Sequence, residues 1–381
     1  MLVSICGDPG GAHAVAPVLH LLQEEGRFDL APYAYNQGLE ILSRRGIPCR
    51  PLPPQIDGDW TRRRLEEDRP RLILTGTSHN GRDCEKVFIQ TARRLGVPSL
   101  AVLDFWSNYV VRFSDEQGTL AALPDLVAVM DQRARSDLIA AGIPADTILV
   151  TGQPAYDSLR ESREAFSPER RLELRKGLGL AANDRWIVFA SQPFSTLYPD
   201  PQSPTYPGYD EHLVLAELIR ALEGLAGTCP GGLLLQVRPH PREKVADLAR
   251  HRSGGIRLLV SADGDARELA MAADLVVGMN SAFLVEACYL GAVVLSLQPG
   301  LRVADPLPTN SWHASRAVYR REEIGTALRE LLLDDGARQA ARSRAAALEL
   351  DGQAARRVVD RIYAKLPALP PGMDPVAGPP S

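Results

Sequence analysis

Two segments in the second half of the chain carry side chains suited to an anionic ligand. The first, LQVRPHPRE at 235–243, places Arg238 and His240 directly after an apolar run. The prolines that follow them, Pro239 and Pro241, favour extended backbone geometry and hold both side chains at the end of a strand. An arginine and a histidine so placed suit a phosphate or diphosphate. A single histidine is more often structural, but this setting favours a functional role.

The second segment, VVGMNSAFLVEACYLGAVVLSL at 276–297, is the most specific signal in the chain. An apolar strand ends beside Gly278, and a helix follows with Asn280 or Ser281 as its cap. The free N–H groups of a first helical turn attract anions. Glu286 lies on an otherwise apolar helix, where an unpaired carboxylate would be costly. Ribose hydroxyls would be natural partners for it; a solvent-facing glutamate at the helix edge is the structural alternative.

The phosphate and ribose contacts suggested above together describe a nucleotide site, and Ser191 and Gln192 are further candidates for it. They directly follow the first strand of the second half, in FASQPFS. A Pro-rich insertion with several tyrosines comes directly afterwards, at 195–211. Loops of this length without regular structure are uncommon and often functional. An ordered loop over a cleft and a long surface loop are equally open interpretations.

The first half begins with a glycine-rich turn, CGDPGGAHAV. Gly10 and Gly11 allow close backbone approach, and a helix starting around Ala12 would present free N–H groups to a phosphate or a sugar. Asp8 and His13 lie at this turn and could act as a general base toward a hydroxyl. The structural alternatives are a turn or cap residue for Asp8 and a surface residue for His13.

Two further turns of the first half carry polar side chains. In LDFWSNYVVRF, Asp104 directly follows an apolar run and precedes two aromatic residues. It is either a carboxylate of an acceptor site or a helix cap beside core aromatics. In TGTSHNGRD, His79 and Asn80 follow another strand, again either as site residues or as a capped helix start. Asp8, His13 and Asp104 are the candidate bases, in no fixed order.

The elements that must position these residues follow the pattern of βα repeats, which predicts parallel sheets. We expect strands at 2–6, 30–35, 72–75, 99–103, 126–129, 148–151, 186–190, 233–238, 256–260, 275–277 and 293–297. We expect helices at 13–25, 84–95, 211–223, 242–250, 266–273, 281–290, 322–333 and 336–366. The predicted fold class is α/β, with two Rossmann-like, doubly wound domains facing across a cleft and ligands beyond the carboxyl ends of strands. The expected bounds are 1–160, 161–366 and a Pro-rich tail at 367–381.

Composition limits the function. The chain has 381 residues and a net charge of -4, which argues against a general nucleic-acid binder. The turn at 6–15 is not GxGxxG, so no nicotinamide or flavin cofactor is predicted. The five cysteines form no CxxC pair, and no carboxylate pair follows a strand, so no metal is predicted either. No apolar run is long enough to span a membrane, and the cytoplasm is the expected compartment.

Together these segments resemble the GT-B superfamily of nucleotide-sugar enzymes. The stretch from Ser281 to LGAVVLSL looks like their donor-binding helix, where a glutamate holds the nucleotide ribose. ILVTGQPAYDSL at 148–159 looks like the interdomain segment of non-hydrolysing UDP-N-acetylglucosamine 2-epimerases. RPHPRE is similar to the His-Pro motif of bacterial Kdo transferases and sialyltransferases, where the histidine contacts the donor phosphate. The resemblance implies a nucleotide-sugar donor bound by the second domain and an acceptor bound by the first.

The chain also departs from the epimerase pattern. It opens with CGDPGGA in place of a Gly-Thr-Arg-Pro-Glu pattern, has Thr77 where those enzymes carry an aspartate, and has ASQPFS where they carry Gly-His-Arg. These losses remove acid–base and binding groups. The acceptor loop of Kdo transferases is not evident either, so the match to that family is also partial.

We therefore expect a metal-independent glycosyltransferase that moves a sugar from a UDP- or CMP-linked donor to a glycan, lipid-linked or other acceptor, in bacterial surface polysaccharide synthesis. An epimerase and a non-catalytic nucleotide-sugar-binding module are the alternatives. Turnover of the nucleotide-sugar donor distinguishes the three functions. A binding module never consumes the donor, an epimerase converts the donor without an acceptor, and a transferase needs the acceptor. Peripheral membrane contact through the Arg-rich stretch at 337–361 is possible, although packing of that helix on the domains is favoured.

Overall fold

The computed structural model describes residues 1–78 and 82–366. His79, Asn80 and the expected tail at 367–381 lie outside this part of the chain. The protein divides into two compact units. The first unit comprises Met1–Asp157 together with the chain from Asp351 onward, and the second unit comprises Ser158–Leu350. No helix in the described residues is long and apolar enough to cross a membrane.

The first unit is built on a parallel sheet with the order β3-β2-β1-β4-β5-β6-β7. Its strands are β1 (Leu2–Cys6), β2 (Leu30–Ala34), β3 (Arg50–Pro51), β4 (Leu72–Thr75), β5 (Ser99–Val102), β6 (Leu126–Val129) and β7 (Ile148–Val150). Its helices are α1 (Pro9–Glu25), α2 (Gln37–Arg44), α3 (Gly58–Asp68), α4 (Cys84–Arg94), α5 (Gln132–Ala140) and α16 (Ala354–Lys365). The strand order reverses between β1 and β4, so the loops after these two strands border the switch point where α/β sheets bind ligands.

The second unit repeats the plan with the order β10-β9-β8-β11-β12-β13. Its strands are β8 (Arg185–Ala190), β9 (Leu233–Arg238), β10 (Arg257–Val260), β11 (Leu275–Gly278), β12 (Val294–Leu297) and β13 (Arg316–Val318). Its helices are α6 (Leu159–Ala165), α7 (Pro168–Gly177), α8 (Phe194–Leu197), α9 (Glu211–Glu223), α10 (Val245–Leu248), α11 (Ala266–Ala272), α12 (Ala282–Tyr289), α13 (Pro308–Ser311), α14 (Ile324–Leu333) and α15 (Asp335–Ala346). The switch point lies between β8 and β11, where the predicted nucleotide residues are.

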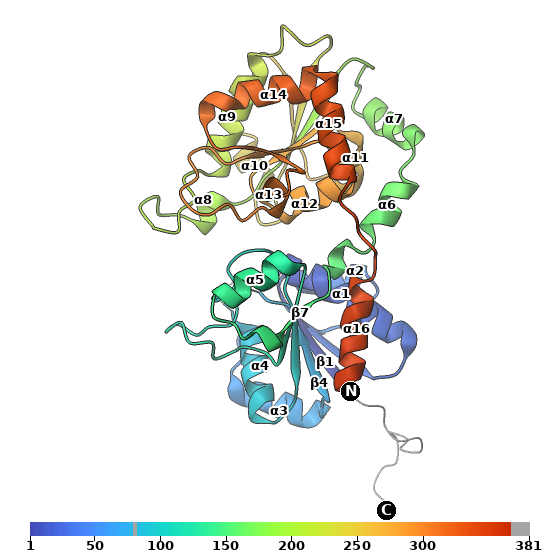
Figure 1. Ribbon diagram of the computed structural model, residues 1–381, viewed down its shortest axis with the longest axis vertical. Helices are drawn as coiled ribbons and strands as arrows, with labels where there is room; N and C mark the ends of the chain where they lie inside the picture. Colours follow the sequence, from blue (N-terminus) through green and yellow to red (C-terminus); the bar gives the residue numbers. More distant parts are fainter. Residues whose placement is uncertain (79–81, 367–381) are drawn as a thin grey trace, which may run out of the picture. The chain divides into compact units, whose positions relative to one another are not determined.

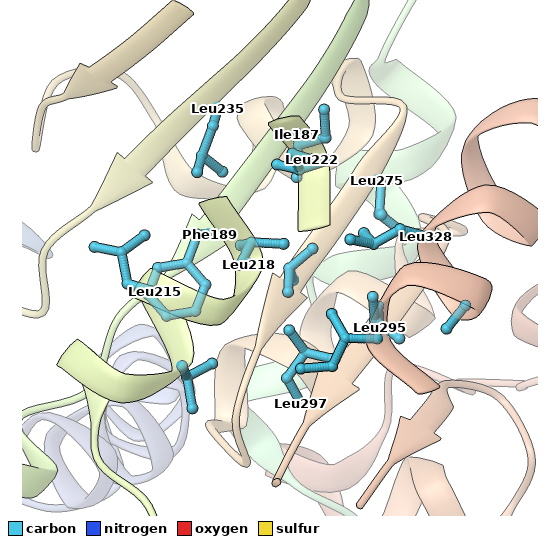
Figure 2. Close-up of a cluster of buried hydrophobic side chains, with 14 of the residues drawn as sticks. Ile187, Phe189, Leu215, Leu218, Leu222, Leu235, Leu275, Leu295, Leu297 and Leu328 are labelled. Carbon is cyan, nitrogen blue, oxygen red and sulfur yellow. The ribbon is translucent and has the colours of Figure 1, made fainter. Parts of the chain in front are cut away.

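Apolar side chains on one face of the second sheet make a continuous core with the helices that cover it. Figure 2 shows Phe189 of β8 beside Leu215 and Leu218 of α9, and Leu295 of β12 beside Leu328 of α14. These side chains are fully buried. Because the strands of a parallel sheet are covered on both faces, they appear in the sequence as continuous apolar runs, which is why their positions were predictable.

The predicted α/β class with two Rossmann-like units is confirmed, and the predicted strands agree with the structure within a residue or two at their ends. Two edge strands, β3 and β13, were missed because they have only two and three residues. The predicted single helix at 336–366 is wrong. It is two helices, α15 and α16, separated by residues 347–353, which include Gly352 in the left-handed region.

Helix α16 also corrects the predicted boundaries, because it belongs to the first unit and not to a domain at 161–366 (Figure 1). Val358, Val359 and Ile362 are buried in the same cluster as the apolar face of α1. The Asp157 carboxylate accepts hydrogen bonds from the first backbone N–H groups of α16, at 3.0 and 2.8 Å. An amphipathic pattern shows that a helix packs on a core, but it does not show on which of two cores.

The packing of α16 on the first unit can be tested by mutation. Ile362→Ala should lower the unfolding free energy of the first unit by about 2–5 kcal/mol, because it leaves a cavity under α16. Hydrogen exchange followed by mass spectrometry should show lost protection in β1 and α1 while the second unit keeps its protection. Arg361→Ala, on the exposed side of the same helix, is the control. Loss of protection in β11 and β12 instead would contradict the assignment of α16.

Candidate functional site

The glycine-rich turn of the first unit is packed tightly against the loop after β4. Helix α1 starts at Pro9, three residues earlier than predicted, with Asp8 at the cap position but without a capping side-chain bond. Gly11 meets Gly76 backbone to backbone, since a Cβ on Gly76 would lie 2.9 Å from the Gly11 Cα. Glycine is therefore required here for contact between two loops of the switch point. Gly10 has a different neighbour, the carboxylate of Asp104.

Asp104 lies over the first turn of α1 and is held by a buried arginine. A Cβ on Gly10 would be 2.0 Å from Asp104 Oδ2. The other oxygen, Oδ1, accepts hydrogen bonds from Arg112 Nη1 at 2.5 Å and from Thr77 Oγ1 at 3.2 Å. The structure thus places Asp104 and Gly10 in contact. A carboxylate already faces this helix start, so the turn suits a sugar hydroxyl better than a second anion.

Glu85, in the first turn of α4, is a buried carboxyl that the sequence analysis missed. It accepts hydrogen bonds from the Gly7 backbone N–H at 3.1 Å, the Tyr35 hydroxyl at 2.6 Å and the Ser78 hydroxyl at 2.5 Å. The Ser78 hydroxyl in turn accepts the N–H of Asp8 at 3.0 Å. Burial raises the pKa of Glu85 to about 7, even though these hydrogen bonds act in the opposite direction. Glu85 therefore anchors the turn that carries Asp8.

His13 is placed differently from the other two candidate bases. It lies in the second turn of α1 with an exposed side chain. Its Nδ1 is 3.4 Å from Nη2 of Arg45. Asp8 and Asp104 lie at the turn itself, whereas His13 lies one turn further along α1.

In the second unit, hydrogen bonds join the loops after β9 and β8. Glu243 accepts the Ser191 hydroxyl at 2.8 Å and the backbone N–H of His240 at 2.6 Å. Glu243 was not among the predicted residues. Arg238 donates to the backbone oxygen of Asp263 at 2.9 Å, which ties the β9 end to the loop after β10. The RPHPRE segment is thus held in one conformation by partners that its own sequence does not reveal.

His240 is neutral around pH 7. Burial lowers its pKa to about 4, and the charge of Arg242 acts in the same direction. Its Nδ1 accepts the Arg242 backbone N–H at 3.1 Å, so the neutral ring carries its proton on Nε2. His240 can therefore donate one hydrogen bond to a ligand without contributing charge.

A second set of bonds joins the loops after β8 and β11. Gln192 and Asn280 pair twice, from Gln192 Nε2 to Asn280 Oδ1 at 3.2 Å and from the Asn280 N–H to Gln192 Oε1 at 3.0 Å. Tyr209, from the Pro-rich insertion, is fully buried and donates to Gln298 at 3.0 Å. Its hydroxyl also accepts from Asn280 Nδ2 at 3.5 Å. Part of the insertion at 195–211 is thus packed into the second unit through Tyr209.

Ser281 stands at the start of α12 with its hydroxyl unused. It occupies the N-cap position, as predicted, but its side chain makes no capping bond. Its Oγ is buried and has no hydrogen-bond partner among the described residues. A buried hydroxyl without a partner is unfavourable. It lies at a helix start, where an anion would be favoured.

Glu286 is paired, contrary to the expectation that only a ligand or solvent would satisfy it. Its Oε2 lies 3.2 Å from Nε of Arg267 in α11, and both side chains are 24% exposed. Arg267 also donates to the Ser158 hydroxyl at 2.9 Å. The ion pair fixes the direction of the Glu286 carboxylate and leaves it partly accessible.

Two further observations concern metal ions and a pocket outside the predicted site. No group of three or more His, Cys, Asp or Glu side chains in residues 1–78 and 82–366 could hold a metal ion. A pocket of about 640 Å³ in the second unit is lined by α7, β10 and the loop at 261–264, and it contains none of the predicted site residues.

No family model matches the sequence, and no curated protein matches it. Solved structures match it over nearly their whole length. The S. aureus MnaA–UDP co-structure is 17% identical and covers 97% of each chain, with a TM-score of 0.70. UDP-GlcNAc 2-epimerase from Neisseria meningitidis, bound to UDP-GlcNAc, is 15% identical over 95% of this chain and 99% of that one, at 0.68. Anabaena HepE in complex with UDP is 16% identical over 97% and 99%, at 0.64.

The chain has the GT-B fold. The likeness covers both units, which is more than the short motifs of the sequence could establish. Two residues of the segments that depart from the epimerase pattern have bonding partners within their own units. Thr77 is engaged by Asp104 and Arg112, and Ser191 is bonded to Glu243.

The buried carboxyl of Glu85 should make stability depend on pH. Its folded-state pKa is raised to about 7 from an ordinary 4.5. Its contribution to stability is therefore fully present below pH 4.5 and is lost as the pH rises through 7. Glutamine does not titrate, so Glu85→Gln should gain on the order of 2 kcal/mol relative to the unmodified protein between pH 5 and pH 8. Urea unfolding at the two pH values measures this.

Glu116→Gln, at an exposed glutamate of the same unit, is the matched control and should show no such change. An equal difference between Glu85→Gln and the unmodified protein at pH 5 and pH 8 would show that Glu85 does not titrate in this range.

Proposed function

We propose that this chain is an enzyme acting on a nucleotide-linked sugar, with the nucleotide held by the second unit. The unused Ser281 hydroxyl at the start of α12 carries the proposal. A phosphate oxygen would accept this hydroxyl and the free N–H groups of the first helical turn together. The solved structures of the same fold contain UDP or UDP-GlcNAc, which supports the choice of ligand.

The other groups at this edge of the sheet would supply complementary contacts. Neutral His240 would donate from Nε2 to a phosphate oxygen, and Arg238 would supply the positive charge that His240 lacks. Glu286, directed by Arg267, would accept the ribose hydroxyls. Ser191, Gln192 and Asn280 would position these loops through their mutual bonds and those to Glu243, besides any contact of their own with the ligand.

The first unit would supply the reacting group toward the sugar or the acceptor. Asp104 is the favoured base, because it is only partly buried and its orientation is fixed by Arg112 and Thr77. Asp8 is the second candidate, on a turn anchored by Glu85. Gly10 and Gly11 leave room at this turn for the Asp104 carboxylate and for the backbone of Gly76, which pack against them.

Two reactions are open to such an enzyme. Epimerisation at C2 of a UDP-linked N-acetylhexosamine is the first candidate, since structures named as 2-epimerases match both units end to end. Glycosyl transfer to a glycan or lipid-linked acceptor is the second. It is favoured by Thr77 and by the ASQPFS segment, which stand where epimerases carry an aspartate and Gly-His-Arg.

Binding can be tested independently of the reaction. UDP should raise the melting temperature of the protein by mass action. Ser281→Ala should keep or slightly raise the melting temperature without ligand, because the hydroxyl makes no bond and its burial is unfavourable. It should weaken UDP binding about tenfold, the equivalent of one hydrogen bond to a charged group. Titration calorimetry with UDP and CMP measures the affinity and selects the base.

Ser167→Ala is the matched control, because that serine caps α7 with a real bond to the Arg170 N–H at 3.1 Å. It should cost about 1 kcal/mol of stability and leave UDP affinity unchanged. Equal UDP affinity in Ser281→Ala and the unmodified protein would rule out the proposed phosphate position.

The reaction itself is identified by incubating the protein with UDP-GlcNAc alone in D2O and recording NMR spectra. Epimerisation removes the proton at C2, so deuterium should appear there together with the 2-epimer. A transferase would leave C2 protonated and release UDP only when acceptor is added. Asp104→Asn should lower either activity at least a hundredfold. Binding without turnover under both conditions would identify a non-catalytic module.

A further inference from the structure

The pocket of about 640 Å³ in the second unit has mostly apolar walls. Its volume lies in the range of about 300–1,000 Å³ that is usual for small-molecule sites. The walls are formed by α7, by strands β8 to β10, by the loop at 261–264 and by α11. The apolar side chains that line it include those of Leu174, Leu178, Trp186, Leu259 and Leu269. The pocket therefore offers the space and the surface to enclose a ring-sized apolar molecule.

Gln236 of β9 is a polar side chain within these walls. It lies between Leu235 and Val237, which belong to the core on one face of the sheet, so Gln236 points to the opposite face. It is 3% exposed, and its Oε1 accepts the Trp186 Nε1–H at 3.1 Å. An indole nitrogen only donates, so this bond determines which end of the amide faces Trp186. The amide nitrogen, Nε2, is therefore directed away from the indole nitrogen.

Gln236 Nε2 is a donor without a hydrogen bond to any of residues 1–78 and 82–366. Within this part of the chain, the side chain of Gln236 bonds to Trp186 and to no other group. Nε2 is not among the fully enclosed unpartnered atoms of the same residues, so it is reachable from the pocket that Gln236 lines. Small-molecule sites combine apolar walls with a few placed polar groups that orient the ligand. An acceptor oxygen on the ligand would complete the bonding of this amide.

The charged side chains that line the pocket argue against an anionic ligand. They are Arg170, Glu173 and Asp263. Arg170 is paired with two carboxylates, that of Glu268 at 2.8 Å and that of Glu173 at 3.1 Å. Its charge is therefore already balanced, and Asp263 adds negative charge. A phosphate would find no unpaired cation among these lining residues, in contrast to the proposed nucleotide site with Arg238.

We propose that this pocket is a second ligand site, which takes a neutral, ring-sized apolar molecule bearing a carbonyl or hydroxyl oxygen. The ring would pack against the leucines of α7 and β10, and its oxygen would accept the Gln236 Nε2–H. The site does not depend on the proposed function. It is adjacent to the nucleotide site, because the Asp263 backbone oxygen in its wall accepts the Arg238 bond.

A matched pair of probes tests the pocket: 2-acetylnaphthalene, which has a ketone oxygen, and 2-ethylnaphthalene, which lacks it. Both carry the ring that the apolar walls would enclose. The ketone should bind about fivefold more tightly than the hydrocarbon, as expected for one neutral hydrogen bond. Titrations followed by the NMR relaxation of each probe measure the two affinities. Binding of neither probe, or equal affinities, would overturn the proposal.

Two variants separate the Nε2 donor from the bond between Trp186 and Gln236. Gln236→Leu removes Nε2, so it should bind the two probes with equal affinity. Trp186→Phe is the matched control, because it breaks the same internal bond and keeps Nε2. It should retain the preference for the ketone. Loss of that preference in both variants would point to a general disturbance of packing and would overturn the proposal.

A third variant locates the bound probe. Leu259 is a partly buried residue of β10 that lines the pocket, and tryptophan at this position would fill the space. Leu259→Trp should therefore bind neither probe, while its melting temperature shows that it is folded. Unchanged binding by folded Leu259→Trp would place the probes elsewhere and overturn the proposal.

UDP tests whether the two sites are separate. Excess UDP should leave the affinity for 2-acetylnaphthalene unchanged. Displacement of the probe by UDP would show that the pocket belongs to the nucleotide site and would overturn its assignment as a second site. If UDP does not bind at all, the proposed function fails, and the probe pair with the three variants still decides whether the pocket is a ligand site.

Discussion

Buried polar groups need partners, and this requirement organises the carboxyl edges of both sheets. Three side chains each bind groups from two loops: Glu85 and Arg112 in the first unit, and Glu243 in the second. Gln192 joins its own loop to that of Asn280. A buried polar group left without its partner would cost about 1–3 kcal/mol. Separating the loops would break these bonds, so the bonds stabilise the loops against one another. The parallel sheets bring the loops near one another, and these bonds give them definite conformations.

Ser281 is one of the few described residues with a buried polar atom that lacks a hydrogen-bond partner. The Ser281 hydroxyl is buried and unused among the described residues, at a helix start that already favours negative charge. The neighbouring loops are joined to one another by the bonds of Gln192 with Asn280 and of Glu243 with Ser191 and His240. A donor that is already in place can bind a ligand atom without rearrangement of its own side chain, which lowers the entropic cost of binding.

The charged groups near the helix starts of α1 and α12 differ in sign. In the second unit the histidine of RPHPRE is neutral, and the positive charge comes from Arg238 and the α12 start. In the first unit the corresponding helix start faces the Asp104 carboxylate, and a buried arginine balances it. The same βα motif therefore favours an anion in one unit and a neutral, hydroxyl-bearing group in the other.

The sequence alone determined the α/β class, the strand positions and the turns where polar residues gather, because buried parallel strands are continuous apolar runs and ligands meet their carboxyl ends. It correctly singled out Asp104 and Ser281 as residues at such turns. It could not reveal Glu85, Arg112, Glu243 or Arg267, because the most distant partner of each lies 35 to 109 residues away along the chain. It also could not assign α16 to the first unit. Those features were decided by tertiary structure, since local periodicity records which face of an element is buried but not which distant partner buries it.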